Sequence, residues 1–126
     1  MSNEFLSVED IEKVEDIITE EIEVPEWKGK ILMKGLTAEE IYKITEKSKE
    51  LNEVTKQMEI NYEKFDYLRL VYSIITPDLS DKDFLILRNK SGGVIKRLLY
   101  FSELLSSGIK IFDRPEIEKT ELKNEE

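Results

Sequence analysis

Residues 24–40 read VPEWKGKILMKGLTAEE and decide the predicted fold, because they join two β-like segments to the start of a helical remainder. Pro25 and Gly29 bracket a turn-like cluster between runs that are rich in β-branched and aliphatic residues. We therefore predict a β-hairpin whose first arm covers residues 17–24 and whose second arm covers residues 30–35.

Alternation of apolar and polar residues supports this hairpin. The first arm places its aliphatic residues at one parity, at Ile18, Ile22 and Val24. The second arm buries Ile31 and Met33 by the same logic, but Leu32 breaks its alternation and indicates that both faces are partly covered. We interpret Trp27 at the turn as a lid over the domain's own helices, because a single aromatic residue on a hairpin offers a large packing surface.

Thr37 and Glu40 have the spacing of a capping box, in which hydroxyl and carboxylate each accept from a backbone N–H at a helix start. A helix should therefore begin at Ala38. Apolar residues at helical spacing extend it as one amphipathic helix through Met58, and Asn61 then breaks it.

Three further helices are predicted. The first covers roughly residues 62–75 and ends before Pro77, because the residue before a proline avoids helical geometry. Ser80 caps a short helix, and a last helix covers about residues 94–106 and ends at Gly108. The predicted fold class is α+β, mainly α, with an N-terminal two-stranded β-hairpin followed by about four helices.

The composition excludes several kinds of chemistry. The chain has 126 residues, of which 40% are hydrophobic, and it contains neither cysteine nor histidine. Disulfides, thiolate nucleophiles, imidazole bases and the usual zinc sites are therefore excluded. We expect no catalytic residues, no cofactor and no metal, and we do not expect an enzyme. Asp78, Asp81 and Asp83 could hold a hard cation, but they equally suit the start of a helix.

The net charge of −9 is unevenly distributed. Residues 1–26 contain ten acids and one base, residues 27–112 contain twelve acids and fifteen bases, and residues 113–126 contain six acids and three bases. This distribution predicts an acidic N-terminal arm at residues 1–16, a single globular domain at residues 17–112 and a disordered acidic tail at residues 113–126. Within the domain, residues 17–35 form the hairpin and residues 38–112 the helices.

The acidic arm has a weak amphipathic pattern, in which Ser7 caps a short helix. Two interpretations stay open: the arm frays, or it becomes ordered only against a partner. No basic segment followed by an apolar run begins the chain, and no apolar stretch approaches the length of a membrane span. We therefore expect a soluble, cytoplasmic protein without a membrane partner.

The last predicted helix is apolar over a wide face. In one interpretation this helix lies between two layers of the domain. In the other, its extra apolar surface contacts another chain. The candidate partner-binding residues are Phe84, Leu87, Leu99, Phe101 and Leu105. Core packing is the alternative for each of them.

A local basic cluster is formed by Arg88, Lys90, Lys96 and Arg97. It leaves open a small nucleic-acid-binding regulator, although the acidic arm would compete with phosphates and disfavours this function. The arm could instead lie on the basic cluster of a neighbouring copy, which predicts self-association.

The order of these features resembles that of phage tail assembly chaperones, small proteins of long-tailed phages and phage-tail-like elements. The resemblance covers roughly residues 18–109, and it rests mainly on VPEW at residues 24–27, LTAEE at residues 36–40 and TPDL at residues 76–79. The family's usual glycine–glutamate pair near the last helix is replaced by FSEL at residues 101–104.

This resemblance implies a domain that binds the tape measure protein, keeps its long apolar helices soluble and helps to recruit tail tube subunits. A client helix would lay its apolar stripe against exposed apolar positions of this chain. Such a protein acts in the bacterial cytoplasm and is not part of the mature virion. A structural head–tail or tail-completion component of the virion is the other phage function that stays open.

Overall fold

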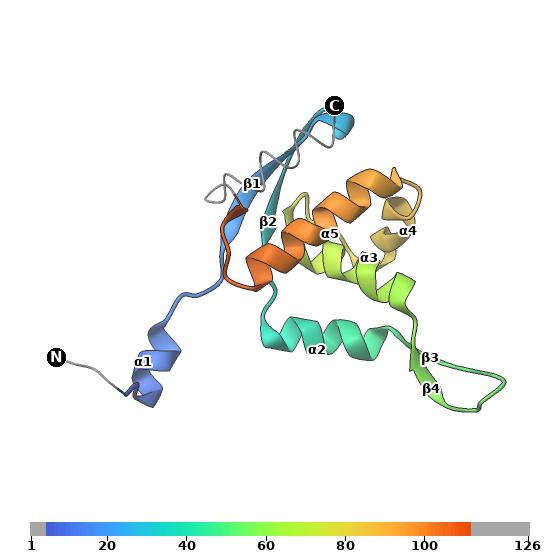
Figure 1. Ribbon diagram of the computed structural model, residues 1–126, viewed down its shortest axis with the longest axis horizontal. Coiled ribbons are helices and arrows are strands. Elements are labelled where there is room, and N and C mark those ends of the chain that lie inside the picture. The colour runs from blue at the N-terminus through green and yellow to red at the C-terminus, as the bar shows by residue number, and fades with distance from the viewer. Residues whose placement is uncertain (1–4, 112–126) are drawn as a thin grey trace.

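A computed structural model describes residues 5–111 and shows a mixed α+β fold (Figure 1). A three-stranded sheet packs against helices, and two segments project from this body. They are helix α1 (Val8–Lys13) and a second hairpin formed by β3 (Lys49–Leu51) and β4 (Met58–Ile60). The predicted tail at residues 113–126 lies outside the described residues.

The N-terminal hairpin forms from β1 (Thr19–Val24) and β2 (Gly29–Lys34), close to the predicted arms. The 3-10 turn η1 (Pro25–Trp27) joins the strands, and Lys28 after it has a left-handed backbone with a φ of 59°. Leu32 is half-buried on the outer face, as its break in the alternation indicated. The inner face buries alternate residues of both strands, namely Ile22, Val24, Ile31 and Met33.

A third strand, β5 (Ile74–Thr76), pairs antiparallel with β2. The helix predicted for residues 62–75 was therefore wrong over its last turn, because α3 (Tyr62–Ser73) ends where the strand begins. The open edge of β2 accounts for the change, since its backbone groups need hydrogen-bond partners once they are buried. Ile74 pairs opposite Met33 and stays buried, so the chain loses no apolar contact by leaving the helix.

The helix α2 (Ala38–Lys47) begins at the predicted residue but is much shorter than predicted. It ends at Ser48, whose buried hydroxyl donates to the carbonyl of Ile44 at 2.7 Å. The prediction of one helix through Met58 was wrong, because β3 and β4 form a hairpin there. Asn52 sets its turn: its side-chain oxygen accepts from the N–H groups of the residues two and three positions later, at 2.9 and 3.1 Å.

The C-terminal part contains, in order, the 3-10 turn η2 (Asp81–Asp83), the short helix α4 (Phe84–Leu87) and the long helix α5 (Gly92–Ser106). The N–H of Ser80 donates to the carboxylate of Asp83 at 2.7 Å, so the predicted cap Ser80 precedes the turn η2, and α4 begins after it at Phe84. Gly108 has a φ of 81° and closes α5, since its N–H donates to the carbonyl of Leu105 at 3.0 Å.

The main core lies between the inner face of the sheet, α3 and α5. Because α5 contacts both α3 and β2, its wide apolar face is used within the molecule. A smaller cluster joins Leu36, Ile44 and Leu68 between α2 and α3. The buried residues of the main core are Ile22, Val24, Ile31, Met33, Leu70, Val71, Ile74, Leu87, Val94, Ile95, Leu98, Phe101, Leu105 and Ile111.

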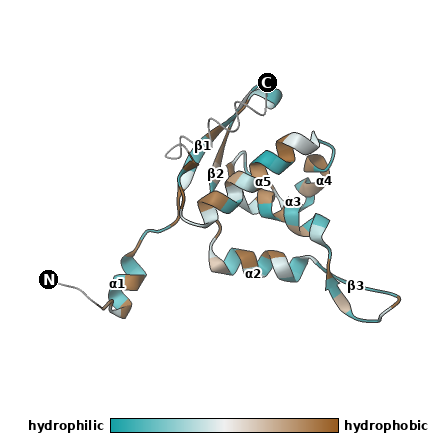
Figure 2. Cartoon of the chain, viewed as in Figure 1, coloured by the Kyte–Doolittle hydropathy of each residue, from teal (hydrophilic) through white to brown (hydrophobic). Residues whose placement is uncertain are grey.

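Ser7 caps the short helix α1, as the sequence predicted, and Asp10 completes a capping box. The N–H of Asp10 donates to the Ser7 hydroxyl, and the N–H of Ser7 donates to the Asp10 carboxylate at 2.9 Å. Every residue from 5 to 17 is nonetheless exposed, and α1 lies away from the body (Figure 1). Figure 2 shows that this isolated helix carries apolar residues. Among residues 5–111, no helix is both long and apolar enough to cross a membrane.

Candidate partner-binding surface

The five predicted partner-binding residues do not form an exposed surface. Leu87, Phe101 and Leu105 are buried in the main core, with exposed fractions of 4%, 8% and 2%. A partner cannot contact them while the domain keeps this fold. Phe84 and Leu99 are half-buried and pack against the same core, so only their outer atoms are accessible. The helical pattern identified the apolar faces correctly, but it contained no sign that β2 and α3 cover them.

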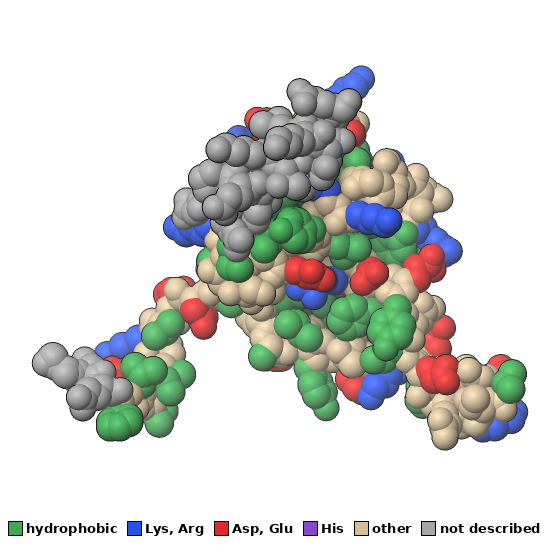
Figure 3. Space-filling view, in the orientation of Figure 1, with side chains coloured by type: hydrophobic (Ala, Val, Ile, Leu, Met, Phe, Trp, Pro, Cys, Tyr) green, Lys and Arg blue, Asp and Glu red, His purple; other side chains and the backbone are tan. Residues whose placement is uncertain are grey.

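Exposed apolar side chains lie instead at several other places, including the acidic arm, the second hairpin and α4. The acidic arm presents Phe5, Leu6, Val8, Ile11 and Val14. The second hairpin presents Leu51, Val54 and Met58, and Figure 3 shows apolar side chains on both of these projections. The third place is α4, where Leu85 and Ile86 are 51% and 55% exposed. We call Leu85 and Ile86 the α4 ridge.

The α4 ridge has a fixed position because the helix beneath it is anchored. Leu87 is buried in the core, and the side-chain amide of Asn89 donates to the carbonyl of Leu85 at 3.1 Å. Arg88 follows the ridge and lies 3.6 Å from a carboxylate oxygen of Glu63 on α3. The ridge is thus a short apolar surface on a rigid support, bordered by charged groups.

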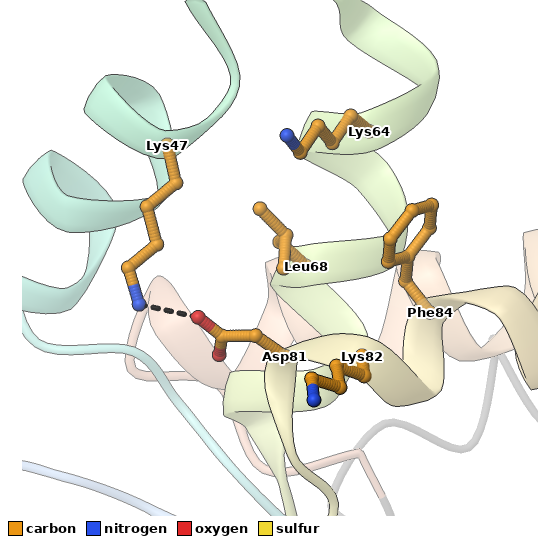
Figure 4. A pocket seen from close by; sticks show the side chains of 6 residues that line it. All are labelled: Lys47, Lys64, Leu68, Asp81, Lys82 and Phe84. Carbon is orange, nitrogen blue, oxygen red and sulfur yellow. Dashed lines mark hydrogen bonds and ion pairs between the residues drawn. The ribbon is translucent and has the colours of Figure 1, made fainter.

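A groove opens beside α4, between the end of α2, the outer face of α3 and the η2 turn. It has a volume of about 390 Å³. Figure 4 shows Leu68 in its middle, with Phe84 at one side and charged side chains around both. We call it the lysine groove, and its lining residues are Lys47, Lys64, Leu68, Asp81, Lys82 and Phe84.

One lysine of this groove is held in place and two are available. The ammonium of Lys47 donates to the carboxylate of Asp81 and, at 2.6 Å, to the hydroxyl of Tyr72. The hydrogen bond to Asp81, followed by that to Tyr72, raises the pKa of Lys47. Lys64 and Lys82 form no ion pair with any of residues 5–111. The groove therefore combines an apolar floor with uncompensated positive charge.

The basic cluster predicted from the sequence is partly neutralised. The guanidinium of Arg97 forms two hydrogen bonds with the carboxylate of Glu26, at 3.0 and 2.7 Å. These bonds lower the pKa of Glu26. Since Arg88 also pairs with Glu63, only Lys90 and Lys96 of the cluster remain without an ion pair among the described residues. The arrangement ties the hairpin tip to α5 and gives little basic surface for a nucleic acid.

Two of the three aspartates that could have held a cation, Asp81 and Asp83, have other partners. Asp81 pairs with Lys47, and Asp83 accepts from the N–H of Ser80. Over the part of the chain that the structure describes, no three acidic side chains are grouped closely enough to hold a metal ion. These contacts agree with the capping role that the sequence offered as the second interpretation.

Sequence reasoning missed the α4 ridge and the lysine groove for different reasons. The sequence predicted a short helix here but not which of its apolar residues are exposed, and a helix of four residues cannot bury every side chain. Lys64 and Lys82 belong to different elements, and only the packing of α3 against η2 brings them to one groove. A lysine on a helix surface carries no local signal of such a role.

Comparisons with known proteins find no protein similar to this chain. A scan against protein-family models finds no match, and searches of curated proteins and of solved structures find no match either.

Proposed function

We propose that the chain is a tail assembly chaperone of a long-tailed phage or a phage-tail-like element. Its client is the tape measure protein, which it keeps soluble until the tail assembles, and it also helps to recruit tail tube subunits. The resemblance at residues 24–40 supports this proposal. The observation that carries it is the α4 ridge, an exposed apolar surface on a rigid helix.

The α4 ridge fits one apolar stripe of a long client helix. Leu85 and Ile86 are adjacent on α4 and more than half exposed, so a client helix can cover both without unfolding the domain. The outer atoms of Phe84 extend this surface toward the lysine groove. Charged residues at its border, such as Arg88, would fix the orientation of the client and increase the association rate.

This mode of action requires no covalent chemistry. A client that exposes apolar helices aggregates through those surfaces, and a small acidic protein bound to them replaces apolar contact with charge repulsion. The chain carries a net charge of −9, which suits a solubilising role. The proposed site of action is the cytoplasm of the bacterial host, and the chain leaves the tail before the virion matures.

Co-expression with the tape measure protein tests this function. The wild-type chain should keep the client in the soluble fraction, and the double variant Leu85→Asp, Ile86→Asp should lose most of this effect. Val54→Asp, which changes an even more exposed apolar residue on the second hairpin, is the control and should behave as wild type. An aggregated client in the presence of the wild-type chain would refute the proposal.

Mass spectrometry of purified particles separates the chaperone from a virion component. The chain should be absent from mature particles, whereas stoichiometric amounts would favour the structural head–tail or tail-completion function.

A further inference from the structure

We infer that the acidic arm of one copy docks into the lysine groove of a second copy. The arm is the segment of residues 5–16, and the groove is the one lined by Leu68, Phe84 and the three lysines. This inference concerns association of the chain with itself and does not depend on the identity of any client.

The arm exposes apolar side chains that no described part of its own chain buries. Its helix has six residues, which is too short to be stable in water by itself. Val8 and Ile11 lie on the same side of the helix, three residues apart, and are 76% and 61% exposed. Phe5 before the helix is 90% exposed. A capped helix with this apolar content needs a surface to cover it.

The groove supplies a surface of the matching kind. The half-buried Phe84 gives it an accessible apolar surface, onto which the Val8 and Ile11 side of the arm can pack, while Leu68 lies buried beneath the groove. Its volume of about 390 Å³ is that of a few side chains, not of a whole folded domain. A short helix that inserts two or three apolar side chains is therefore the appropriate occupant.

Charge complementarity distinguishes the arm from other segments. Residues 5–16 contain five acids and one lysine, and they alternate with the apolar residues. Glu12 lies one turn after Val8 and so borders the apolar side of the helix. Lys64 and Lys82 at the groove have no ion-pair partner among residues 5–111, so acids of the arm would supply one to each.

The occupant is a second copy because the chain directs its own arm away from the body. None of residues 5–17 is buried, and the segment between α1 and β1 extends outward (Figure 1). In this arrangement both the arm and the groove of each copy remain free for a neighbour. Exchange of a terminal segment between copies is a low-cost route to association, because the acidic arm and the lysine groove of each copy carry opposite charges.

Sedimentation velocity over about a hundredfold range of protein concentration tests the inference. The wild-type chain should associate, and Ile11→Asp should raise the dissociation constant at least about tenfold. The described residues of the arm are all exposed, so this variant should unfold at the wild-type temperature. Val54→Asp adds the same charge at a surface outside the proposed contact and should associate as wild type.

Charge reversal locates the receptor. Lys64→Glu with Lys82→Glu should weaken association about tenfold, and adding Glu12→Lys should restore part of it. The control variant Lys90→Glu with Lys96→Glu makes the same change in net charge within the basic cluster that the sequence predicted. It should have little effect on association. A misfolded groove variant would not regain association when the charge of the arm is reversed. Restored association would therefore show that the arm and the groove contact each other.

Three results would overturn the inference. The first is a chain that stays monomeric at every concentration, which includes the case of an arm docked on its own body. The second is association that Lys90→Glu with Lys96→Glu abolishes while the groove variant retains it. The third is a groove variant that loses only binding of the tape measure protein, since the groove would then be a client site.

Discussion

Gly35 allows the sheet and the last helix to approach each other. A β-carbon at this position would lie 2.4 Å from the carbonyl oxygen of Leu105, a distance that backbone atoms cannot accept without moving. The next residue continues this contact, because the N–H of Leu36 donates to the hydroxyl of Ser106 at 2.9 Å. The KGLT sequence therefore does more than connect β2 to α2, since its glycine sets the spacing between β2 and α5.

Gly35→Ala should lower the free energy of unfolding by about 2 kcal/mol, because β2 and α5 must separate to admit the methyl group. Urea denaturation followed by tryptophan fluorescence measures the change. Gly29→Ala at the start of β2 is the matched control, since a β-carbon there meets no atom within 4 Å, and it should change stability by less than about 0.5 kcal/mol. Equal effects of the two variants would contradict this account of Gly35.

Local signals predicted the beginnings and ends of most helices. Ser7, Thr37 and Asn61 each accept from a backbone N–H of the helix that follows. Ser7 and Thr37 were identified as caps from residue type and spacing alone, and Asn61 as a break before the next helix. Gly108 likewise ends α5 where a glycine is expected. These features depend on residues within one turn of each other, so the sequence contains all the information they need.

Pairing between distant residues produced the errors. The helix was predicted to extend through Met58 because Ile44, Leu51 and Met58 are spaced by seven residues, which is a helical spacing. The turn that replaces it depends on the side chain of Asn52 and on Lys56, which has a φ of 63°. Neither a glycine nor a proline marks that turn, and β5 forms only because β2 offers an open edge.

The start of α2 contributes a pH-dependent part of the stability. Burial alone would raise the pKa of Glu40, but hydrogen bonds from the ammonium of Lys34 and the N–H of Thr37 outweigh burial and lower it. The folded chain then holds this proton less tightly than the unfolded chain does. Glu40 therefore stabilises the fold fully above its ordinary pKa of 4.5 and loses this effect as the pH falls through the lowered value.

Glu40→Gln should lower the free energy of unfolding by about 1 kcal/mol at pH 7, because the ion pair with Lys34 and part of the helix cap are lost. The difference from wild type should shrink as the pH is lowered from 7 through 4.5 and below. Unfolding curves in urea at several pH values measure it. Glu39→Gln removes an exposed acid from the same turn and should show a weaker dependence, and an equal one would contradict the role of Glu40.

The arrangement of the body explains why candidate binding residues were hard to predict. The sequence identified apolar faces, yet it could not tell a face covered by another layer of the domain from one that is free. Leu87, Phe101 and Leu105 turned out to be covered, whereas Leu85 and Ile86 turned out to be exposed. Which apolar face is free depends on how β2, α3 and α5 pack, and these contacts join residues far apart in the chain.

The tip of the first hairpin is part of the body despite its peripheral position. Trp27 is half-buried and packs against the main core, and the neighbouring Glu26 pairs with Arg97 of α5. These contacts support the interpretation of Trp27 as a lid over the helices. The hairpin tip should therefore contribute to stability and not to recognition of a client.

Trp27→Ala should lower the free energy of unfolding by about 2 kcal/mol, less than the loss of a fully buried tryptophan. Its effect on solubilisation of the tape measure protein should be small at a temperature where the variant remains folded. Thermal unfolding followed by circular dichroism and the co-expression assay measure the two effects. Loss of client binding at unchanged stability would instead place the client surface at residues 24–40.

The contact between the first hairpin and α5 has a consequence for synthesis on the ribosome. Residues that meet across it are separated by 70 positions for Leu36 and Ser106 and by 71 for Glu26 and Arg97. Chains are made from the N-terminus, so the apolar face of the hairpin emerges well before the helix that covers it. A nascent chain that stops before α5 leaves Ile22, Val24, Ile31 and Met33 without the helix that covers them, so other factors can bind these residues.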